Sequence, residues 1–280
     1  MNDILVGIDF SKCSINALEH ALNLANKADK DIIMVWVNRR ESQKELYNPD
    51  SGNNIIEEVT KRFEALIEKY KPEFKPQLKF EIREGKIYKE IVKVADEYDV
   101  SLIVVGTHGS SGFEEFWIGS NANKTISSTH IPVITIRRKR NLERVLKRIV
   151  LPIDNIPETR QKIIYTAFLA GLFQAEVHVL ALYTVNSKRV QERVDKYAKQ
   201  MLEYLEEEDI KTVYVSQRAD NITNSTIEYA KKIEANLIVI MTEQEYSASN
   251  ILLGPYASQM VNNSPIPVLS MHPKSALSGI

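Results

Sequence analysis

Three apolar segments of the chain occur twice in the same order, and this repetition constrains the fold more strongly than any local propensity. The pairs are Ile4-Leu-Val-Gly-Ile-Asp9 with Ile149-Val-Leu-Pro-Ile-Asp154, Leu102-Ile-Val104 with Leu237-Ile-Val239, and Ile131-Pro-Val-Ile-Thr135 with Ile266-Pro-Val-Leu-Ser270. Three ordered matches indicate two copies of one structural unit. The members of the first pair lie farther apart than those of the other two, so the first copy carries extra residues. We place them in Arg39 to Asn54, a polar stretch rich in turn residues that predicts a surface loop.

Short apolar runs alternate with longer segments of helical period in both copies. The predicted strands of the first copy lie near 3–8, 31–37, 78–84, 101–106 and 131–137, and its helices near 13–28, 54–71, 87–98 and 120–129. The second copy repeats this plan, with strands near 147–153, 176–184, 210–216, 236–241 and 266–272 and helices between them. Several runs are apolar throughout, which is typical of strands covered on both faces. We therefore expect an α/β protein of two tandem three-layer α/β/α domains with parallel five-stranded sheets, at 1–140 and 147–273, followed by a tail at 274–280.

Composition limits what the chain can bind. At 280 residues, 44% of them hydrophobic, it can bury a core in each copy. Lysine and arginine number 36 against 37 acidic residues, so the summed charge does not attract nucleic acid or an anionic membrane, and a polyanion must be bound locally. The one cysteine, Cys13, excludes an internal disulfide and fits a small buried residue in a reducing compartment. No apolar segment is long enough to span a bilayer, and we expect a cytoplasmic protein.

A glycine-punctuated loop follows the predicted strand at 101–106. It reads Gly106-Thr-His-Gly109-Ser-Ser-Gly112-Phe-Glu-Glu-Phe-Trp-Ile-Gly119-Ser120-Asn121 and leads into a predicted helix. Glycines let ligand oxygens approach the main chain, and N–H groups at a helix start point at an anion. Gly106, Gly109, Gly119 and Ser120 therefore predict a phosphate site, which we favour over a flexible connection whose serine only caps the helix. Three further small residues fit a pocket lining and a solvated loop equally well: Ser110, Ser111 and Gly112.

Two residues at the ends of other predicted strands extend this candidate site. Asp9 is placed to accept hydrogen bonds from a ribose hydroxyl or a base amine, or to hold a hydrated metal ion against phosphates. An N-cap of the next helix explains Asp9 nearly as well, and Asp154 occupies the equivalent place in the second copy. At Val37, backbone groups are placed to read an adenine edge while the side chain packs on the ring, although core burial alone explains the side chain.

Two other features receive a simpler explanation. His108 lies in the glycine loop with no carboxylate or nucleophile at a telling spacing, so a solvent-facing loop histidine is preferred to a catalytic base. The basic run Arg137-Arg-Lys-Arg140 fits a solvated linker better than a nucleic-acid site, and we place the domain junction near Arg137 to Leu146. We predict no catalytic residue and no dedicated metal site.

The chain resembles tandem universal stress proteins over about residues 1 to 273, and the spacing of the glycine loop resembles that of nucleotide-binding members. The resemblance implies a Rossmann-like fold of the adenine nucleotide alpha hydrolase type that binds ATP, or ADP or AMP, with or without Mg²⁺. It also implies that Ile131 to Arg137 and Ile266 to His272 pair antiparallel within one chain as a pseudo-dimer, and it leaves room for a homodimer and an unidentified protein partner. The residues that match the family's nucleotide site are Asp9, Val37, Val105, Gly106, Gly109, Gly119, Ser120 and Asn121.

The second copy departs from this pattern. Met241 and Gln244 replace the first two glycines, and Pro255 replaces the serine, which removes a hydroxyl and a backbone N–H donor. Glu243 and Glu245 add negative charge where phosphates would sit. The sequence therefore predicts one nucleotide per chain, with a degenerate second domain used for packing or regulation.

The leading functional hypothesis is a cytoplasmic stress-response sensor or regulator whose state depends on a bound adenine nucleotide. The segment Gly119-Ser-Asn-Ala-Asn-Lys124-Thr125 lacks the glycine that precedes lysine in NTPase phosphate loops, so any hydrolysis is expected to be slow. A nucleotidyl transferase or an ATP pyrophosphatase would need a His-x-x-His or Ser-Gly-Gly-x-Asp-Ser element early in the domain, and neither occurs. A nucleotide-independent interaction scaffold stays open, as does a lid formed by Arg39 to Asn54.

Overall fold

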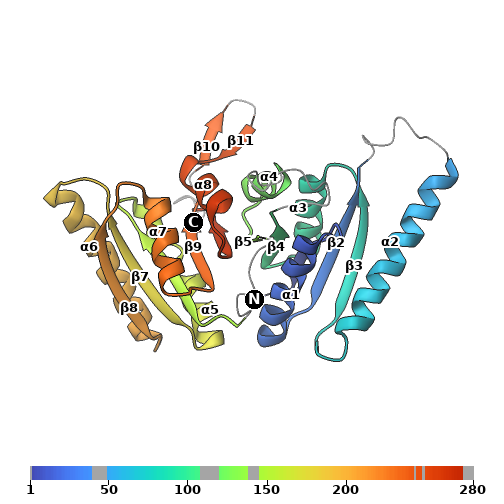
Figure 1. The fold of residues 1–280 in the computed structure, drawn as a ribbon, viewed down its shortest axis with the longest axis horizontal. Helices are drawn as coiled ribbons and strands as arrows, with labels where there is room; N and C mark the ends of the chain where they lie inside the picture. Colours follow the sequence, from blue (N-terminus) through green and yellow to red (C-terminus); the bar gives the residue numbers. More distant parts are fainter. Residues whose placement is uncertain are drawn as a thin grey trace, which may run out of the picture.

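The computed structural model describes residues 2–39, 49–107, 120–137, 145–242, 244–247 and 250–273 (Figure 1). The first half contains β1 (Ile4–Gly7), α1 (Lys12–Ala28), β2 (Ile32–Asn38), α2 (Pro49–Tyr70), β3 (Leu78–Glu84), α3 (Ile87–Glu97), β4 (Leu102–Gly106), α4 (Ser120–Ser128) and β5 (Val133–Ile136). The second half contains β6 (Arg148–Ile153), the 3-10 turn η2 (Pro157–Arg160), α5 (Ile163–Phe173), β7 (Glu176–Tyr183), α6 (Lys188–Glu207), β8 (Thr212–Arg218), α7 (Ile222–Lys232), β9 (Leu237–Met241), β10 (Gln244–Ser247), β11 (Asn250–Leu253), α8 (Pro255–Asn263) and β12 (Val268–Met271).

Ten of the described strands form one sheet, in the order β3-β2-β1-β4-β5-β12-β9-β6-β7-β8. Neighbouring strands within each half are parallel, and each half has the same order when it is followed inward from its own outer edge. At the junction β5 pairs antiparallel with β12, with Ile134 opposite Leu269. The predicted α/β fold is confirmed, and so is the pairing of the two last strands within one chain. This pairing removes an exposed edge from each half.

The hydrophobic core consists of two layers, one on each face of the sheet. Side chains alternate along β1, so that Ile4 and Val6 enter one layer and Leu5 enters the other, all three fully buried. Helices α1, α2, α5 and α6 cover the first layer, and α3, α4, α7 and α8 cover the second. Both layers contain residues from both halves, so the core continues across the β5–β12 junction.

Two elements differ from the sequence predictions. Helix α2 begins at Pro49, so the last residues of the predicted 39–54 surface loop are helical, while residues 40–48 lie outside the described ranges. Proline is tolerated in the first helical turn, which lets a polar segment join the helix. In the second half, the counterpart of the glycine loop contains a two-stranded hairpin, β10–β11, that contacts α4 of the first half. Among the described helices, none is long and apolar enough to cross a membrane.

Each half holds the end of the other half's final helix. Arg137 follows β5, and its Nη1 donates to the carbonyl oxygen of Asn262 in the last turn of α8, at 2.8 Å. His272 follows β12, and its Nε2 lies 2.5 Å from the carbonyl oxygen of Ile126 near the end of α4. The last carbonyls of a helix have no partner inside the helix, so both contacts satisfy groups that need a donor. They add polar specificity to the strand pairing at the junction.

His272 makes the junction sensitive to pH. Its ring is buried, and Nδ1 lies 2.7 Å from Thr242 Oγ1, so a neutral ring donates from Nε2 to Ile126 and accepts at Nδ1. Burial lowers the pKa of His272 below its ordinary value of 6.5, and the charge of His130 acts in the same direction.

The free energy of unfolding should therefore fall as the pH drops below about 6.5, because the unfolded chain then binds a proton that the buried ring resists. Burial also lowers the pKa of His178, which contributes with the same sign. In urea titrations at a series of pH values, His272→Gln should lose part of this slope while keeping an amide donor for Ile126. A variant slope equal to that of the wild type would contradict the assignment.

Candidate functional site

The strand order reverses between β1 and β4, and four of the predicted site residues lie at the strand ends beside this reversal. β1 lies between β2 and β4, all three parallel, so their carboxyl ends open on the same edge of the sheet. The pairing of β1 with β4 ends at Val6 opposite Val104, and the two chains then leave the ladder. Ligands of open α/β sheets bind in the crevice at such a reversal. Asp9 follows β1, Val37 lies near the end of β2, and Val105 and Gly106 end β4.

The remaining predicted residues belong to the loop after β4 and to α4. Helix α4 starts at Ser120, with Asn121 as its second residue, so the predicted helix start is confirmed. The helix packs against α3 and β5. Gly109 and Gly119 lie outside the described residues, as do His108, Ser110, Ser111 and Gly112.

Asp9 shapes the turn between β1 and α1. Its Oδ1 accepts the backbone N–H of Ser11 at 3.0 Å, and its own N–H donates to Ser14 Oγ at 3.3 Å. The N-cap of α1 is Ser11, whose hydroxyl accepts from the N–H of Ser14 at 3.2 Å, so the N-cap interpretation of Asp9 is wrong. Asp154 Oδ1 accepts the N–H of Ile156 at 3.0 Å in the same way. The carboxylate therefore serves the turn in both copies.

Phe10, which sequence reasoning missed, fixes this turn to the core. Its φ of 59° lies in the left-handed region, which costs a residue with a Cβ about 1–2 kcal/mol. Its ring packs against Phe63, with centroids 5.0 Å apart, and Phe63 stacks on Phe80 at 4.8 Å. The Arg62 guanidinium lies 5.5 Å from the Phe10 ring. An aromatic residue directly after Asp9 is the only signal the sequence offers. Strained backbone held by packing is common at binding sites.

Val37 directs its backbone toward the crevice. Along a strand, alternate residues turn their N–H and C=O groups to the same neighbour. The carbonyl of Val35 accepts the N–H of Ile8 on the β1 side, at 2.8 Å, and the carbonyl of Asn38 accepts the N–H of Gly85 on the β3 side, at 3.0 Å. The N–H and C=O groups of Val37 therefore point to the β1 side, at a level beyond the end of β1 at Gly7. Its side chain is buried, as the core interpretation predicted.

Gly106 has a packing role that is independent of any ligand. A Cβ at this position would lie 3.0 Å from Cys13 Sγ, 3.1 Å from the Cys13 carbonyl carbon and 3.2 Å from the Ser14 nitrogen. Two of these atoms are main chain, which cannot move without displacing the start of α1. Cys13 itself is buried with its Sγ 3.2 Å from the carbonyl oxygen of Ile136, so the prediction of a small buried residue is confirmed.

In the second half, the residues beside the equivalent crevice differ from those of the first half. Residues 157–173 correspond to α1, because Asp154 matches Asp9 and the left-handed C-cap Gln174 (φ 54°) matches Asp29 (φ 53°). Their first turn is the 3-10 turn η2, and Lys162 stands where the first half has the buried Ala17. The Lys162 ammonium donates to the carbonyl oxygen of Pro152 at 2.5 Å and to Thr159 Oγ1 at 3.1 Å.

A buried cation therefore occupies the space at the carboxyl end of β6. Burial lowers the pKa of Lys162 to about 8, and the Asp154 carboxylate opposes this shift. The turn η2 contacts β9, as α1 contacts β4 in the first half. At the start of α8, Pro255 is the first helical residue and supplies no N–H, and its N-cap Gly254 has an ordinary φ of −58°.

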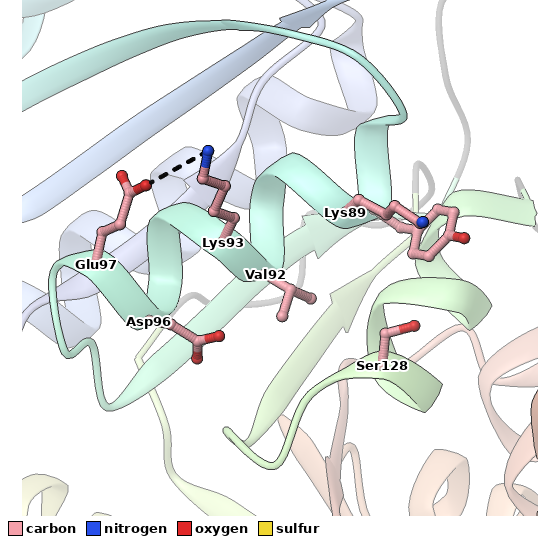
Figure 2. Close-up of a pocket in the computed structure, with 7 residues that line it drawn as sticks. Lys89, Val92, Lys93, Asp96, Glu97 and Ser128 are labelled. Carbon is pink, nitrogen blue, oxygen red and sulfur yellow. Dashed lines mark ion pairs between the residues drawn. The ribbon is translucent and has the colours of Figure 1, made fainter.

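A shallow groove lies between α3 and α4, apart from the crevice (Figure 2). Its volume is about 580 Å³, and it is lined by Tyr88, Lys89, Val92, Lys93, Asp96, Glu97 and Ser128. Lys93 Nζ pairs with Glu97 Oε1 at 3.9 Å along α3. None of the predicted site residues lines this groove, and Ser128 lies at the opposite end of α4 from Ser120. The groove does not belong to the candidate site.

The chain is similar to universal stress proteins over nearly its whole length. The model of the Universal stress protein family matches residues 1–137 and again residues 146–272. Universal stress protein MJ0531 of Methanocaldococcus jannaschii is 31% identical over 140 residues, 48% of this chain and 81% of that protein. Universal stress protein YxiE of Bacillus subtilis is 32% identical over 146 residues, 49% of this chain and 99% of that protein. Each of these relatives thus aligns with about half of the chain.

A solved universal stress protein from Archaeoglobus fulgidus has the same fold over both halves. It superposes with a TM-score of 0.75 at 18% identity, covering 98% of this chain and 99% of that one.

Replacing Gly106 by alanine should destabilise the protein by about 1–3 kcal/mol, because the added methyl meets the main chain at the start of α1. Gly171→Ala is the matched control. There the methyl meets Ile210 Cδ1 at 3.6 Å, an ordinary contact, and alanine should stabilise helix α5 by about 0.5–1 kcal/mol. Chemical denaturation of both variants checks the pair. A Gly106→Ala variant as stable as the wild type would contradict the packing role.

Proposed function

The chain belongs to the universal stress protein family, and we propose that it is a stress-response sensor or regulator that binds ATP or another adenine nucleotide in its first half. The observation that carries the proposal is the coincidence of a strand-order reversal with the glycine-punctuated loop that follows β4. Either feature alone would be common. Together they support a phosphate site at the edge where α/β sheets receive ligands.

Each predicted residue has a role in this proposal. The backbone of Val37 faces the crevice and reads the adenine edge, while Asp9 accepts from a ribose hydroxyl at the end of β1. The loop amides from Gly106 to Gly119, together with the N–H groups of Ser120 and Asn121 at the start of α4, receive the phosphates. Val105, at the end of β4, packs beneath the ligand.

Mg²⁺ fits this arrangement only as a companion of the nucleotide. The described residues contain no group of three or more histidine, cysteine or acidic side chains that could hold a metal ion. Magnesium is commonly held by one carboxylate and by phosphate oxygens, with water completing the shell. Asp9 is the carboxylate placed for that role, and the ion would offset the charge of the phosphates.

The second half is proposed to bind no nucleotide. Lys162 fills the position of an alanine beneath the crevice and satisfies its ammonium with protein oxygens. Pro255 lacks the N–H that Ser120 offers at the equivalent helix start. The hairpin β10–β11 replaces the loop that would receive phosphates. We therefore expect one nucleotide per chain.

A sensor is favoured over an enzyme because the described crevice offers phosphates a helix start and backbone amides but no assembled acid–base pair. Slow ATP hydrolysis and a nucleotide-independent scaffold are the alternatives. A turnover assay separates the enzyme from the sensor, and mass spectrometry of small molecules released from freshly purified protein separates the sensor from the scaffold.

The reducing compartment expected from the buried thiol of Cys13 favours the cytoplasm as the location of the protein.

One solved universal stress protein was determined in complex with cAMP. It is 14% identical to this chain, with a TM-score of 0.39, and it carries no argument for this site. Cyclic AMP nevertheless belongs in the ligand panel beside ATP, ADP and AMP.

The double variant Gly109→Asp with Ser120→Ala should abolish ATP binding in isothermal titration without unfolding the protein, because a carboxylate and a lost hydroxyl oppose the phosphates. Wild-type protein should bind ATP at one site per chain. Gln244→Asp, the same change at the equivalent position of the second copy, should leave the affinity unchanged. Unchanged affinity in the double variant, or two equivalent sites in the wild type, would refute the proposed pocket.

A further inference from the structure

Helix α5 is apolar on all sides, including the side that faces solvent. Its eleven residues, Ile163-Ile-Tyr-Thr-Ala-Phe-Leu-Ala-Gly-Leu-Phe173, include no charged side chain. One side packs on the sheet, through Ile163, Thr166, Ala167, Leu169 and Ala170. On the opposite side, Ile164 is 66% exposed and Phe168 is 41% exposed. A helix that is hydrophobic all round is normally buried, and α5 is too short to cross a bilayer.

The first half shows that the fold does not require this apolar side. With Asp9 matched to Asp154 and Asp29 to Gln174, the exposed positions of α5 can be read against α1. The outer stripe Ile164, Phe168, Gly171 and Leu172 corresponds to the polar residues Glu19, Asn23, Asn26 and Lys27. Glu19 is half-buried and accepts a hydrogen bond from Tyr70 Oη of α2 at 2.8 Å. The outer stripe of α5 is thus an addition specific to the second half.

We propose that a second copy of this chain covers the outer stripe, and that the two α5 helices pack against each other about a two-fold axis. Without a charge on α5 the stripe cannot select a partner by charge, and the surface it fits is another apolar helix stripe. A stripe that meets its own copy is matched in length and polarity, as a two-fold interface requires.

The surroundings of α5 are consistent with a chain–chain interface. α5 contacts α1 of the first half, so a second copy seated on α5 would extend the contact that already joins the two halves. An eleven-residue helix is about 16 Å long, and a stable dimer buries about 800 Å² on each partner. The flanking helices α1 and α6 both contact α5, so their outer faces would take part in an interface of that size. A membrane is disfavoured because α5 offers no lysine or arginine for lipid head groups.

Sedimentation velocity of the full chain tests the proposal. The wild type should sediment as a dimer of the 32.0 kDa chain at micromolar concentration. The double variant Ile164→Glu with Phe168→Asn carries the residue types that α1 has at the equivalent positions, and it should be monomeric with an unchanged melting temperature. Ile56→Glu on α2 is the matched control, because Ile56 is 48% exposed and α2 packs on the edge strand β3, away from α5; it should remain dimeric. A monomeric wild type, or a dimeric double variant, would overturn the proposal.

A cross-linking experiment keeps the test decisive if the double variant does not fold. Phe168→Cys should form a disulfide-linked dimer on mild oxidation, whereas Ile56→Cys should not, and the native Cys13 is buried. Absence of the Phe168→Cys cross-link would contradict a two-fold contact. Binding of monomeric protein to vesicles of phosphatidylcholine and phosphatidylglycerol, lost in the double variant, would assign the stripe to a membrane and would also overturn the proposal. Neither result bears on nucleotide binding.

Discussion

The antiparallel pairing of β5 with β12 holds the two halves of the molecule together. It joins two parallel five-stranded halves into one sheet and lets each hydrophobic layer run across the junction. Arg137 and His272 then hold the final helix of the opposite half. Because the last strand of each half pairs within the chain, one molecule contains two equivalent crevices and two equivalent helix faces. They no longer have to remain alike.

The two halves have diverged at equivalent positions, and a few substitutions explain how. Where the first half has Ala17 beneath its crevice, the second has Lys162, whose ammonium is satisfied by protein oxygens. Where the first half has a helix start at Ser120, the second has Pro255. Pro255 removes an N–H donor that an anion would use, and the Lys162 side chain fills space in the second half with its ammonium already bound to protein oxygens. The strand order is undisturbed. The polar face of α1 has become an apolar face on α5. We infer that the first half binds the ligand and that the second half provides the contact surface.

The strands, helices and strand pairing could be predicted because repetition fixes what local propensity leaves open. The start of α2 at Pro49 could not be predicted. The first residues of this helix are turn-forming types that favour a loop by themselves, and they become helical because they continue the packed part of α2. The β10–β11 hairpin was also missed, because Ala248-Ser249 between its strands is not a typical turn sequence. Asp9, Val37, Val105 and Gly106 lie at one edge as predicted. The packing role of Gly106 and the burial of Lys162 depend on neighbours distant in sequence, which no local pattern reveals.

The two halves are expected to differ in occupancy, with an adenine nucleotide in the first half and none in the second. A crystal structure of the full chain grown with millimolar ATP tests it most directly. Adenine density is expected beside Val37 and phosphate density at the start of α4, with the space above Lys162 free of nucleotide. Nucleotide density in the second crevice with the first one vacant would show that the nucleotide site has been assigned to the wrong half.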